Sequence, residues 1–534
     1  MTTSATFDEN TRKIESIPLI WAALPVAILI ALLACNVFIY KADSSYGPNQ
    51  IALLVGAAVA TAIGCLLHVK VKTCIDGMVD SIKSSLGAML ILLLIGGLTG
   101  AWIISGVVPA MVYYGLQILS PDIFLVATVL ICSVVSLATG SSWTTVATVG
   151  VALIEIGKAL GFSDAVTAGA IISGAYFGDK ISPLSDTTNL APAMAGTDLF
   201  THIRYMLWTT VPTYLITIVA FVVLGLTIDA SNSEAAATAL SEAIESKFTL
   251  SPLLFLVPAA VIVMVIMKFD AAVALFIAMI LGALVAVVFQ PKLVSELAST
   301  THSRFEFSGQ MVEAESIDTT TTTESSAVDS EAEQKITMPG FMRYPLEAYD
   351  TATSAMANGV IIDVANEDAQ KLLSRGGMSG MLNTIWLIFC AMCFGGAMEA
   401  VGLLERLTLP LVRMAKSTGA LIGTTAASCL FLNVTASDQY LAIVVPGRMF
   451  RKTYSERGLA PQNLSRTLED SGTVTSVLVP WNTCGATQSS VLGVDTLSYA
   501  RYCVFNYVSP LMTVFFGAMH IAIAKKANLQ SEKE

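Results

Sequence analysis

The fold of this chain is decided by residues 173–189, which read SGAYFGDKISPLSDTTN. A helix is interrupted at Pro183, because proline has no amide hydrogen and leaves a carbonyl one turn earlier without its donor. Six of the eight residues 182–189 have side chains that carry oxygen: Ser182, Ser185, Asp186, Thr187, Thr188 and Asn189. A second stretch, residues 469–484, reads EDSGTVTSVLVPWNTC and is interrupted at Pro480. The sequence therefore predicts two helices that are broken at polar residues.

The composition of the whole chain is apolar enough for a membrane protein, in which these two broken helices would lie within the bilayer. Of 534 residues, 54% are hydrophobic and 13% charged, and mean hydropathy is +0.70, whereas soluble domains carry about a quarter charged residues. Five runs approach or exceed the roughly 20 residues that a helix needs to cross a bilayer: Pro18 to Tyr40, Leu86 to Gly106, Tyr205 to Ile228, Ser251 to Met267 and Tyr502 to Ala524. We expect an all-α polytopic membrane protein with about fourteen hydrophobic segments.

The chain is similar to itself at an offset of 296 or 297 residues. The matches are Gly100-Ala101 with Gly396-Ala397, Gly106 with Gly402, Cys132 with Cys429, Trp143 with Tyr440, Gly150 with Gly447, Gly161 with Gly458, and Asp186-Thr187 with Asn482-Thr483. A looser match pairs Pro18 and Pro25 with Pro252 and Pro258. The two broken helices then hold equivalent places in a duplicated unit of about seven helices.

Lys and Arg predict that the two halves are inverted, because short loops rich in these residues stay in the cytoplasm. The loops at 107–121 and 151–165 contain one basic residue, Lys158, whereas the matching loops at 403–419 and 447–466 contain eight. These are Arg406, Arg413, Lys416, Arg448, Arg451, Lys452, Arg457 and Arg466. Both termini are expected in the cytoplasm, next to Arg12, Lys13, Lys70, Lys72, Lys525, Lys526 and Lys533. Inverted repeats are the usual construction of secondary transporters.

These patterns divide the chain into six parts. They are an N-terminal helix pair (1–85), a first transport repeat (86–228), a second helix pair (229–290), a polar acidic external loop (291–378), a second, inverted transport repeat (379–525) and a cytoplasmic tail (526–534). Residues 301–340 of the loop hold eight acids against two basic residues and contain the run Thr319 to Thr323. The composition is typical of a solvated loop. An inert spacer is the favoured interpretation, and a sensor or docking segment is the alternative.

The first break has the ligands that a dehydrated alkali cation needs. Na⁺ is a hard ion that prefers oxygen, so we expect a Na⁺ site in the Asp186 cluster. Its predicted members are Asp179, Ser182, Ser185, Asp186, Thr187, Thr188, Asn482 and Thr483. The alternative is a surface loop in which the Ser-Asp-Thr-Thr sequence caps a helix.

Ionisable groups within the membrane are candidates for proton coupling. They are Asp186, Glu155, Asp438, Glu469 and Asp470. Asp186 is the strongest, because it lies inside the break. Glu155 has the alternative of pairing with Lys158 one turn away, and Asp438 that of capping a helix. If Na⁺ and H⁺ compete for one carboxylate that moves between the two sides only when it is neutralised, antiport follows.

The motif at residues 178–192, GDKISPLSDTTNLAP, resembles the signature of the NhaC family of bacterial Na⁺/H⁺ antiporters. The second half is similar to that family in Pro446-Gly447-Arg448-Met449-Phe450, Leu464-Ser465-Arg466, Glu469-Asp470-Ser471-Gly472-Thr473 and Pro480-Trp481-Asn482. The resemblance covers residues from about 85 to 520. The insert at 297–340 departs from the family's core.

This resemblance implies a multi-pass protein of the bacterial inner membrane, in the ion transporter superfamily, that exchanges cytoplasmic Na⁺ for external H⁺ and serves pH homeostasis. Its partners would be the lipid bilayer, Na⁺ (with Li⁺ as a further ion) and H⁺. A homodimer is compatible with this reading, and we expect no nucleic-acid partner and no cofactor. Some relatives exchange carboxylates, such as malate for Na⁺ and lactate, so the family leaves the substrate open.

Three other functions are alternatives. An organic-anion exchanger on the same fold would hold a carboxylate at the helix N-termini near Thr188 and Thr483, with Lys180 and Arg448 as anion partners. A membrane enzyme is disfavoured, because the four histidines are far apart and lack ligand spacing. A passive channel would be excluded by uphill flux.

Overall fold

The computed structural model describes residues 16–40, 44, 46–227, 233–267, 269–308, 335–364, 370, 373–374, 376–414 and 417–526. Arg12, Lys13, Lys416, Lys533 and the run Thr319 to Thr323 lie outside these residues. The described part is almost entirely helical, as expected for an all-α polytopic membrane protein.

The first half contains the following elements: α2 (Leu19–Tyr40), α3 (Pro48–Leu66), α4 (Val71–Ile104), α5 (Val107–Ile118), α6 (Pro121–Thr139), α7 (Ser142–Thr145), η2 (Val146–Gly150), α8 (Val151–Ala159), α9 (Asp164–Ile181), α10 (Asp186–Ala195) and α11 (Leu199–Thr227). The middle contains α12 (Ser233–Lys247), η3 (Pro252–Phe255), α13 (Leu256–Ile266), α14 (Ala271–Phe289), α15 (Pro291–Leu297), α16 (Ser299–Arg304), β1 (Phe305–Ser308), β2 (Ile336–Pro339), η4 (Gly340–Met342) and α17 (Arg343–Asn358). The second half contains η5 (Met378–Met381), α19 (Leu382–Val401), α20 (Leu403–Met414), α21 (Thr418–Thr435), α22 (Gln439–Glu456), α23 (Gln462–Leu468), η6 (Glu469–Thr473), η7 (Ser476–Leu478), α24 (Thr483–Leu492), α25 (Thr496–Ala500) and α26 (Val504–Ala518).

Within the described ranges, eight helices are long and apolar enough to cross a membrane, and a pair bent by 95° between Lys247 and Pro252 would make a ninth. Two shorter apolar helices, α5 and α26, add to these. The sequence predicts about fourteen segments, and the difference has a physical reason. The central helices are interrupted at polar residues. Helix α9 has 18 residues but carries Asp164, Asp179 and Lys180, and α10 and α24, which follow the breaks, have only 10 residues each.

The loops used to count basic residues are mostly helix in the structure. The range 107–121 is occupied by α5, 151–165 by α8, and 403–419 by α20, while Arg448, Arg451 and Lys452 lie on the last turns of α22. Arg466 was counted above as a residue of a loop, but in the structure it lies on α23 and is fully buried. The basic residues still gather at the end of α22, where Arg451, Lys452 and Arg457 are exposed.

The long helix α4 packs against α19, α14 and α17, and the predicted boundary at residue 85 falls inside it. It lies antiparallel along α19, and glycines let the two backbones touch. A Cβ on Gly77 would lie 2.9 Å from the carbonyl oxygen of Gly396, and a Cβ on Gly396 would lie 2.5 Å from that of Gly77. Small residues at such crossings are typical of membrane helices. Near the other end of α4, a Cβ on Gly100 would lie 2.0 Å from the carbonyl oxygen of Ala355 on α17.

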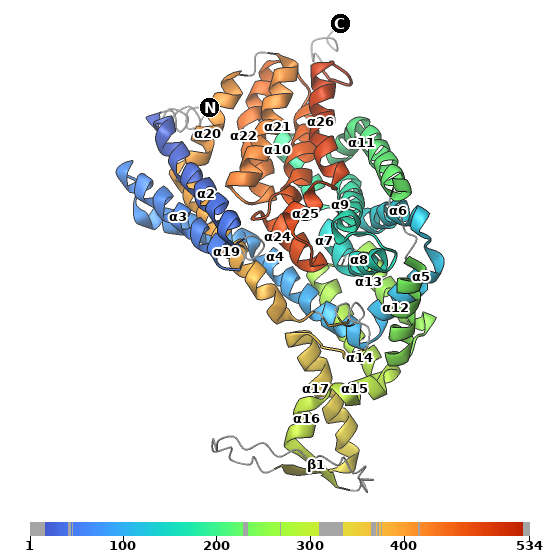
Figure 1. Cartoon of the computed structure of the whole chain (residues 1–534). Coiled ribbons are helices and arrows are strands. Elements are labelled where there is room, and N and C mark those ends of the chain that lie inside the picture. Colours follow the sequence, from blue (N-terminus) through green and yellow to red (C-terminus); the bar gives the residue numbers. More distant parts are fainter. Residues whose placement is uncertain are drawn as a thin grey trace.

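The segment 291–378 differs from the loop expected from its composition. It contains α15, α16 and α17, and β1 pairs with β2 in parallel. These elements form a lobe that projects from the bundle at the end opposite the start of α2 and the end of α26 (Figure 1). Part of the segment is structured because α17 buries one face, with Ala348, Thr351 and Ala355, against neighbouring helices.

Replacing residues 309–334, which lie outside the described ranges, with about eight Gly and Ser residues is expected to leave exchange unchanged. The parallel pairing puts the end of β1 one strand length, about 10 to 13 Å, from the start of β2, and a linker of that length can bridge it. The test compares transport rates at equal amounts of inserted protein. An inserted variant without exchange would show that this segment is part of the transport machinery.

Candidate cation-binding site

Four helices begin around the predicted breaks, and each has a polar N-cap. The side chain of Ser141 accepts a hydrogen bond from the Thr144 amide at the start of α7, and that of Ser185 from the Thr188 amide at the start of α10. Asp438 caps α22 through the Leu441 amide, and Asn482 caps α24 through the Cys484 amide. The capping alternative therefore holds for Ser185 and Asp438. The four capping residues place polar side chains where the N-terminal ends of α7, α10, α22 and α24 meet.

Asp179, near the end of α9, is the most deeply buried carboxylate of the first break, with 8% of its surface exposed. Its Oδ2 accepts hydrogen bonds from the Ser142 amide at 3.0 Å and the Ser142 hydroxyl at 2.7 Å. Its Oδ1 is buried and has no hydrogen-bond partner in the part of the chain that the structure describes. A buried carboxylate oxygen without a donor is costly, so this atom is available for a cation or a proton.

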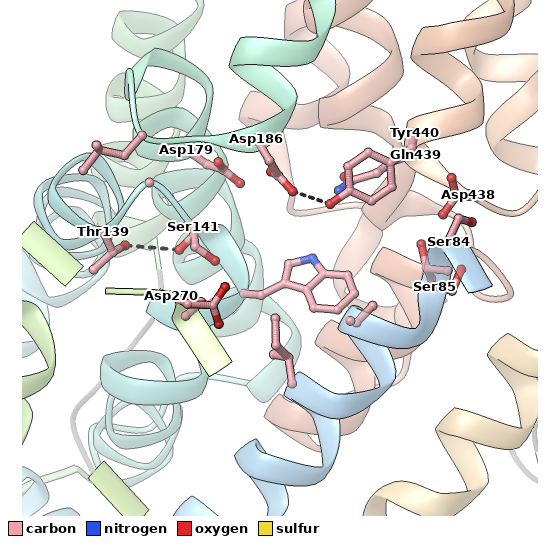
Figure 2. A pocket seen from close by; sticks show the side chains of 18 of the residues that line it. Ser84, Ser85, Thr139, Ser141, Asp179, Asp186, Asp270, Asp438, Gln439 and Tyr440 are labelled. Carbon is pink, nitrogen blue, oxygen red and sulfur yellow. Dashed lines mark hydrogen bonds between the residues drawn. The ribbon is translucent and has the colours of Figure 1, made fainter. Parts of the chain in front are cut away.

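Asp186 is the first residue of α10, where the helix dipole favours an ionised carboxylate. Its Oδ1 accepts a hydrogen bond from the Thr187 amide at 2.9 Å, and its Oδ2 accepts one from the Tyr440 hydroxyl of α22 (Figure 2). Unlike Asp179, it is exposed. Because the Tyr440 contact joins residues 254 positions apart, sequence reasoning could not find it.

Both carboxylates line a cavity of about 510 Å³ (Figure 2). The charged side chains of its wall are all carboxylates: Asp179, Asp186, Asp270 and Asp438. Of the predicted site residues, the cavity thus brings together Asp179, Asp186, Asp438 and Thr483. Its wall also includes Ser84 and Ser85 of α4, and Asp270, the N-cap of α14, which carried no signal in the sequence beyond their polarity. This lining would hold a cation.

Glu469 and Asp470 lie behind the cavity, on the π-helical turn η6, and both are fully buried. The Thr187 hydroxyl donates a hydrogen bond to Glu469 Oε1 at 3.2 Å, whereas Glu469 Oε2 has no partner among the described residues. Since the Thr187 hydroxyl also lies 3.1 Å from that of Ser185, a short row of hydroxyls runs from the N-cap of α10 to Glu469. Single π turns are frequent at functional sites.

Asp470 forms an ion pair with Lys180, and the side chains of both are fully buried. Ser509 accepts a hydrogen bond from Lys180 Nζ at 2.9 Å, and Thr209 donates one to Asp470 Oδ2 at 2.8 Å. Lys180 was a candidate partner for an organic anion. Its positive charge is already compensated by Asp470, a carboxylate from the other half of the chain.

Other predicted site residues support the break rather than line the cavity. The Thr188 hydroxyl donates to the carbonyls of Asp179 and Lys180, and that of Ser182 donates to the Leu137 carbonyl at 2.9 Å. The side-chain amide of Asn482 donates to Asn433. Because carbonyls left free by a break need donors when they are buried, these side chains hold the interrupted helices in place.

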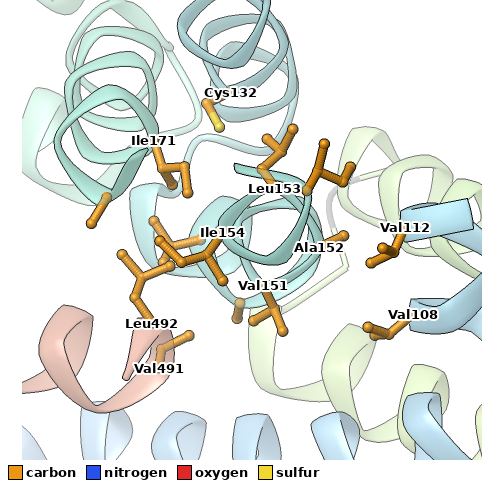
Figure 3. Close-up of a cluster of buried hydrophobic side chains, with 14 of the residues drawn as sticks. Val108, Val112, Cys132, Val151, Ala152, Leu153, Ile154, Ile171, Val491 and Leu492 are labelled. Carbon is orange, nitrogen blue, oxygen red and sulfur yellow. The ribbon is translucent and has the colours of Figure 1, made fainter. Parts of the chain in front are cut away.

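Glu155 lies away from the cavity. It is on α8, which is surrounded by apolar side chains from α5, α6, α9 and α24 (Figure 3). Its Oε1 lies 3.3 Å from Lys158 Nζ, which also lies 3.5 Å from Asp164. The structure therefore shows the ion pair that was the alternative reading of Glu155.

Comparison with known proteins identifies the family. A model of the Na⁺/H⁺ antiporter family matches residues 2–175, 174–323 and 346–521. The chain is 34% identical to the Na⁺/H⁺ antiporter NhaC of Alkalihalophilus pseudofirmus, over 96% of this chain and 97% of that protein. It is 32% identical to the NhaC of Bacillus subtilis, over 84% and 87% of the two chains. It is also 32% identical to the malate-2H⁺/Na⁺-lactate antiporter of Bacillus subtilis, over 91% and 93%. The predicted resemblance to NhaC is confirmed, and the chain belongs to the Na⁺/H⁺ antiporter family.

Proposed function

We propose that this protein exchanges cytoplasmic Na⁺ for external H⁺ across the bacterial inner membrane. The observation that carries the proposal is the cavity at the two breaks. Among the residues that the structure describes, every charged side chain that lines it is a carboxylate, and one buried oxygen, Asp179 Oδ1, has no hydrogen-bond partner. Family membership and the names of the NhaC relatives support it. The same lining argues against the malate-lactate type of exchange, because a carboxylate substrate would be repelled by four carboxylates.

Charge balance explains why the two ions would compete. Asp179, Asp438, Glu469 and Asp470 are buried, while Lys180 compensates only Asp470. Buried carboxylates without a partner are expensive in a low-dielectric surrounding. Either Na⁺ or H⁺ would remove this cost at Asp179 and Asp438, which line the cavity, and at Glu469, which does not. The exposed Asp186 would add a further carboxylate for Na⁺ or H⁺ in the same cavity. Exchange follows if the two halves rearrange only when these groups are neutralised.

We further propose that the chain consists of two inverted repeats, with fourteen segments when short and broken helices are counted. Matching helix bounds support it: α5 with α20 at an offset of 296, α6 with α21 at 297, and α10 with α24 at 297. Residues with positive φ also match, because Gly106, Gly140, Gly161 and Gly196 correspond to Gly402, Ser437, Gly458 and Gly493. Two such halves could expose one site to either side in turn.

The topology can be tested by labelling single cysteines in a background without the nine native ones. A cysteine replacing Arg457, at the exposed end of α22, should react with an impermeant maleimide only from the cytoplasm. A cysteine replacing Glu306, on β1 in the lobe, should react only from outside. Labelling of both from the same side would contradict the proposed orientation.

The exchange itself is tested with purified protein in liposomes and an imposed pH gradient. Addition of Na⁺ should move protons without any organic acid, and Li⁺, K⁺ and dicarboxylates are tested in parallel. Proton movement that required malate or lactate would favour the organic-anion exchanger. Ion flow without uphill transport would favour a passive channel.

A further inference from the structure

A second cavity repeats part of the first at the offset that relates the two halves of the chain. Its volume is about 310 Å³, and it lies between α19 and the end of α24. On α4, the first cavity is lined by Ser84, Ser85, Gly87, Ala88 and Ile91. On η5 and α19, the second is lined by residues that each lie 296 positions later, Gly380, Met381, Asn383, Thr384 and Leu387. The breaks match at the same offset, since Leu184 lines the first cavity and Pro480 the second. The two cavities are therefore formed by equivalent parts of the two halves.

The helix ends next to the two cavities lie toward opposite sides of the membrane. Asp270, at the start of α14, lines the first cavity, whereas the end of α14 leads into the lobe (Figure 1). Tyr46, just before α3, lines the second cavity, whereas the end of α3 leads to the start of α4. Each of these helices has 19 residues and is about 28 Å long. With the lobe outside, the first cavity lies on the cytoplasmic side and the second on the external side.

The helix α24 separates the second cavity from the carboxylates of the breaks. Asp179, Asp186 and Asp438 line the first cavity, and the wall of the second, within the described part of the chain, contains none of them. Residues of α24 take their place there, and the Ser490 hydroxyl donates a hydrogen bond to Met381 Sδ at 3.4 Å. The breaks thus open onto the α4 wall, while α24 covers the equivalent wall of α19.

Each wall has a hydroxyl group that can contact a cation. Ser85 is 3% exposed, and its Oγ has no hydrogen-bond partner among the residues that the structure describes. Thr384 is 8% exposed and lines the second cavity. It lies three residues after Met381, the counterpart of Ser85, and so on the same face of the helix. The oxygen of the neighbouring Asn383 already accepts a hydrogen bond from Gln50 at 3.2 Å. Because Na⁺ prefers oxygen ligands, Ser85 and Thr384 are the matching candidates of the two walls.

We propose that the second cavity is the external entrance to the ion site, and that Ser85 and Thr384 each contact Na⁺ on one side of the membrane only. The breaks face the α4 wall and Ser85 when the site is open to the cytoplasm. They face the α19 wall and Thr384 when the site is open to the outside, after α24 has left that wall. The role of the two hydroxyls rests on the proposed function, but the side from which each wall is reached can be measured without any ion movement.

The first test determines which side of the membrane reaches each wall. Gly87 and Gly380 are exposed in the two walls, and a Cβ on either would meet no heavy atom within 4 Å, so a cysteine fits at both positions. In a background without the nine native cysteines, Gly380→Cys should react with an impermeant maleimide only from outside, and Gly87→Cys only from the cytoplasmic side. Mass spectrometry of protein from vesicles of each orientation counts the labels. Reaction of both variants from one side, or of Gly380→Cys from neither side, would overturn the proposal.

The same label shows whether ions pass through the second cavity. A maleimide bound at Gly380→Cys should abolish exchange, because it fills the path to the α19 wall. The control is Glu306→Cys, exposed on β1 in the lobe, which should be labelled from outside and still exchange normally. Normal exchange by fully labelled Gly380→Cys protein would show that the second cavity is not an entrance.

The second test compares the two hydroxyls by running the exchange in both directions. Na⁺ is supplied on the cytoplasmic side or, under a reversed pH gradient, on the external side. Ser85→Ala should raise the half-saturating Na⁺ concentration about tenfold on the cytoplasmic side alone, because one oxygen contact to a charged ion is lost. Thr384→Val should raise it by a similar factor on the external side alone. A merely structural role would shift both values together, so equal shifts on the two sides, or none in either variant, would reject these ligands.

The outcomes separate this proposal from the proposed exchange. Exchange of Na⁺ for H⁺ by a protein whose Gly380→Cys variant does not react from outside would reject the external entrance and keep the exchange. Labelling of the two walls from opposite sides, in a protein that moves no protons with Na⁺, would keep the two entrances and reject the exchange.

Discussion

Asp186→Asn is expected to abolish Na⁺-dependent proton movement while the protein still inserts and folds. The Thr187 amide and the Tyr440 hydroxyl donate to different oxygens of the carboxylate. The new side-chain amide keeps the size of the side chain, its oxygen can still accept from the Thr187 amide, and its NH₂ group can donate to the Tyr440 hydroxyl oxygen. It cannot bind a proton in the relevant pH range and offers no negative charge to Na⁺. The measurement is proton flux into liposomes at several Na⁺ concentrations and pH values.

Asp198→Asn provides the matched control. Asp198 also precedes a helix and accepts a hydrogen bond from a backbone amide, that of Thr201, at 2.9 Å, but it does not line the cavity. This variant should exchange at the normal rate. Normal exchange by a well-folded Asp186→Asn protein would remove Asp186 from the core of the mechanism, and Asp179 would then be the remaining candidate at the first break.

Asp470→Asn is expected to destabilise the protein by about 3 to 5 kcal/mol, because it leaves the buried ammonium group of Lys180 without its counter-charge. The folded yield and the thermal unfolding temperature should both fall. Size-exclusion chromatography in detergent and a thermal unfolding curve measure these quantities.

The double variant Lys180→Met/Asp470→Asn separates charge balance from other effects. It removes both members of the pair, and most of the lost stability should return. Comparable loss in the single and double variants would show that the fold depends on contacts of Asp470 other than the ion pair, such as that with Thr209.

Local sequence chemistry predicted where the central helices are interrupted, whereas the ion-binding role of the residues there stays a prediction. Pro183 and Pro480 marked the breaks, and residues of both breaks line one cavity. The number of complete spans could not be predicted in the same way. Hydropathy detects apolar composition and not the continuity of a helix, so pieces such as α10 and α24 are counted as segments although they are too short to cross a bilayer.

The sequence alone could not predict which side chains from distant parts of the chain contact one another. Spacing along the chain indicates which groups share a helix face, as for Glu155 and Lys158. It cannot indicate that Lys180 meets Asp470 or that Tyr440 meets Asp186, because these contacts depend on how distant helices pack. Likewise, hydroxyls of one short motif have different roles, since Thr188 faces free carbonyls while Thr187 faces Glu469.

The helix α4 joins the cavity wall to the projecting lobe as one continuous element. Its 34 residues form a rod of about 50 Å, which lies along α19 and the preceding turn η5 from Gly77 to Gly96, carries Ser84 and Ser85 into the cavity wall, and touches α17 near Gly100. Ser85 and Gly100 are about 23 Å apart on this helix. A displacement of the lobe at α17 therefore strains the same helix that forms the cavity wall, and a ligand that clamps the lobe would restrain that wall.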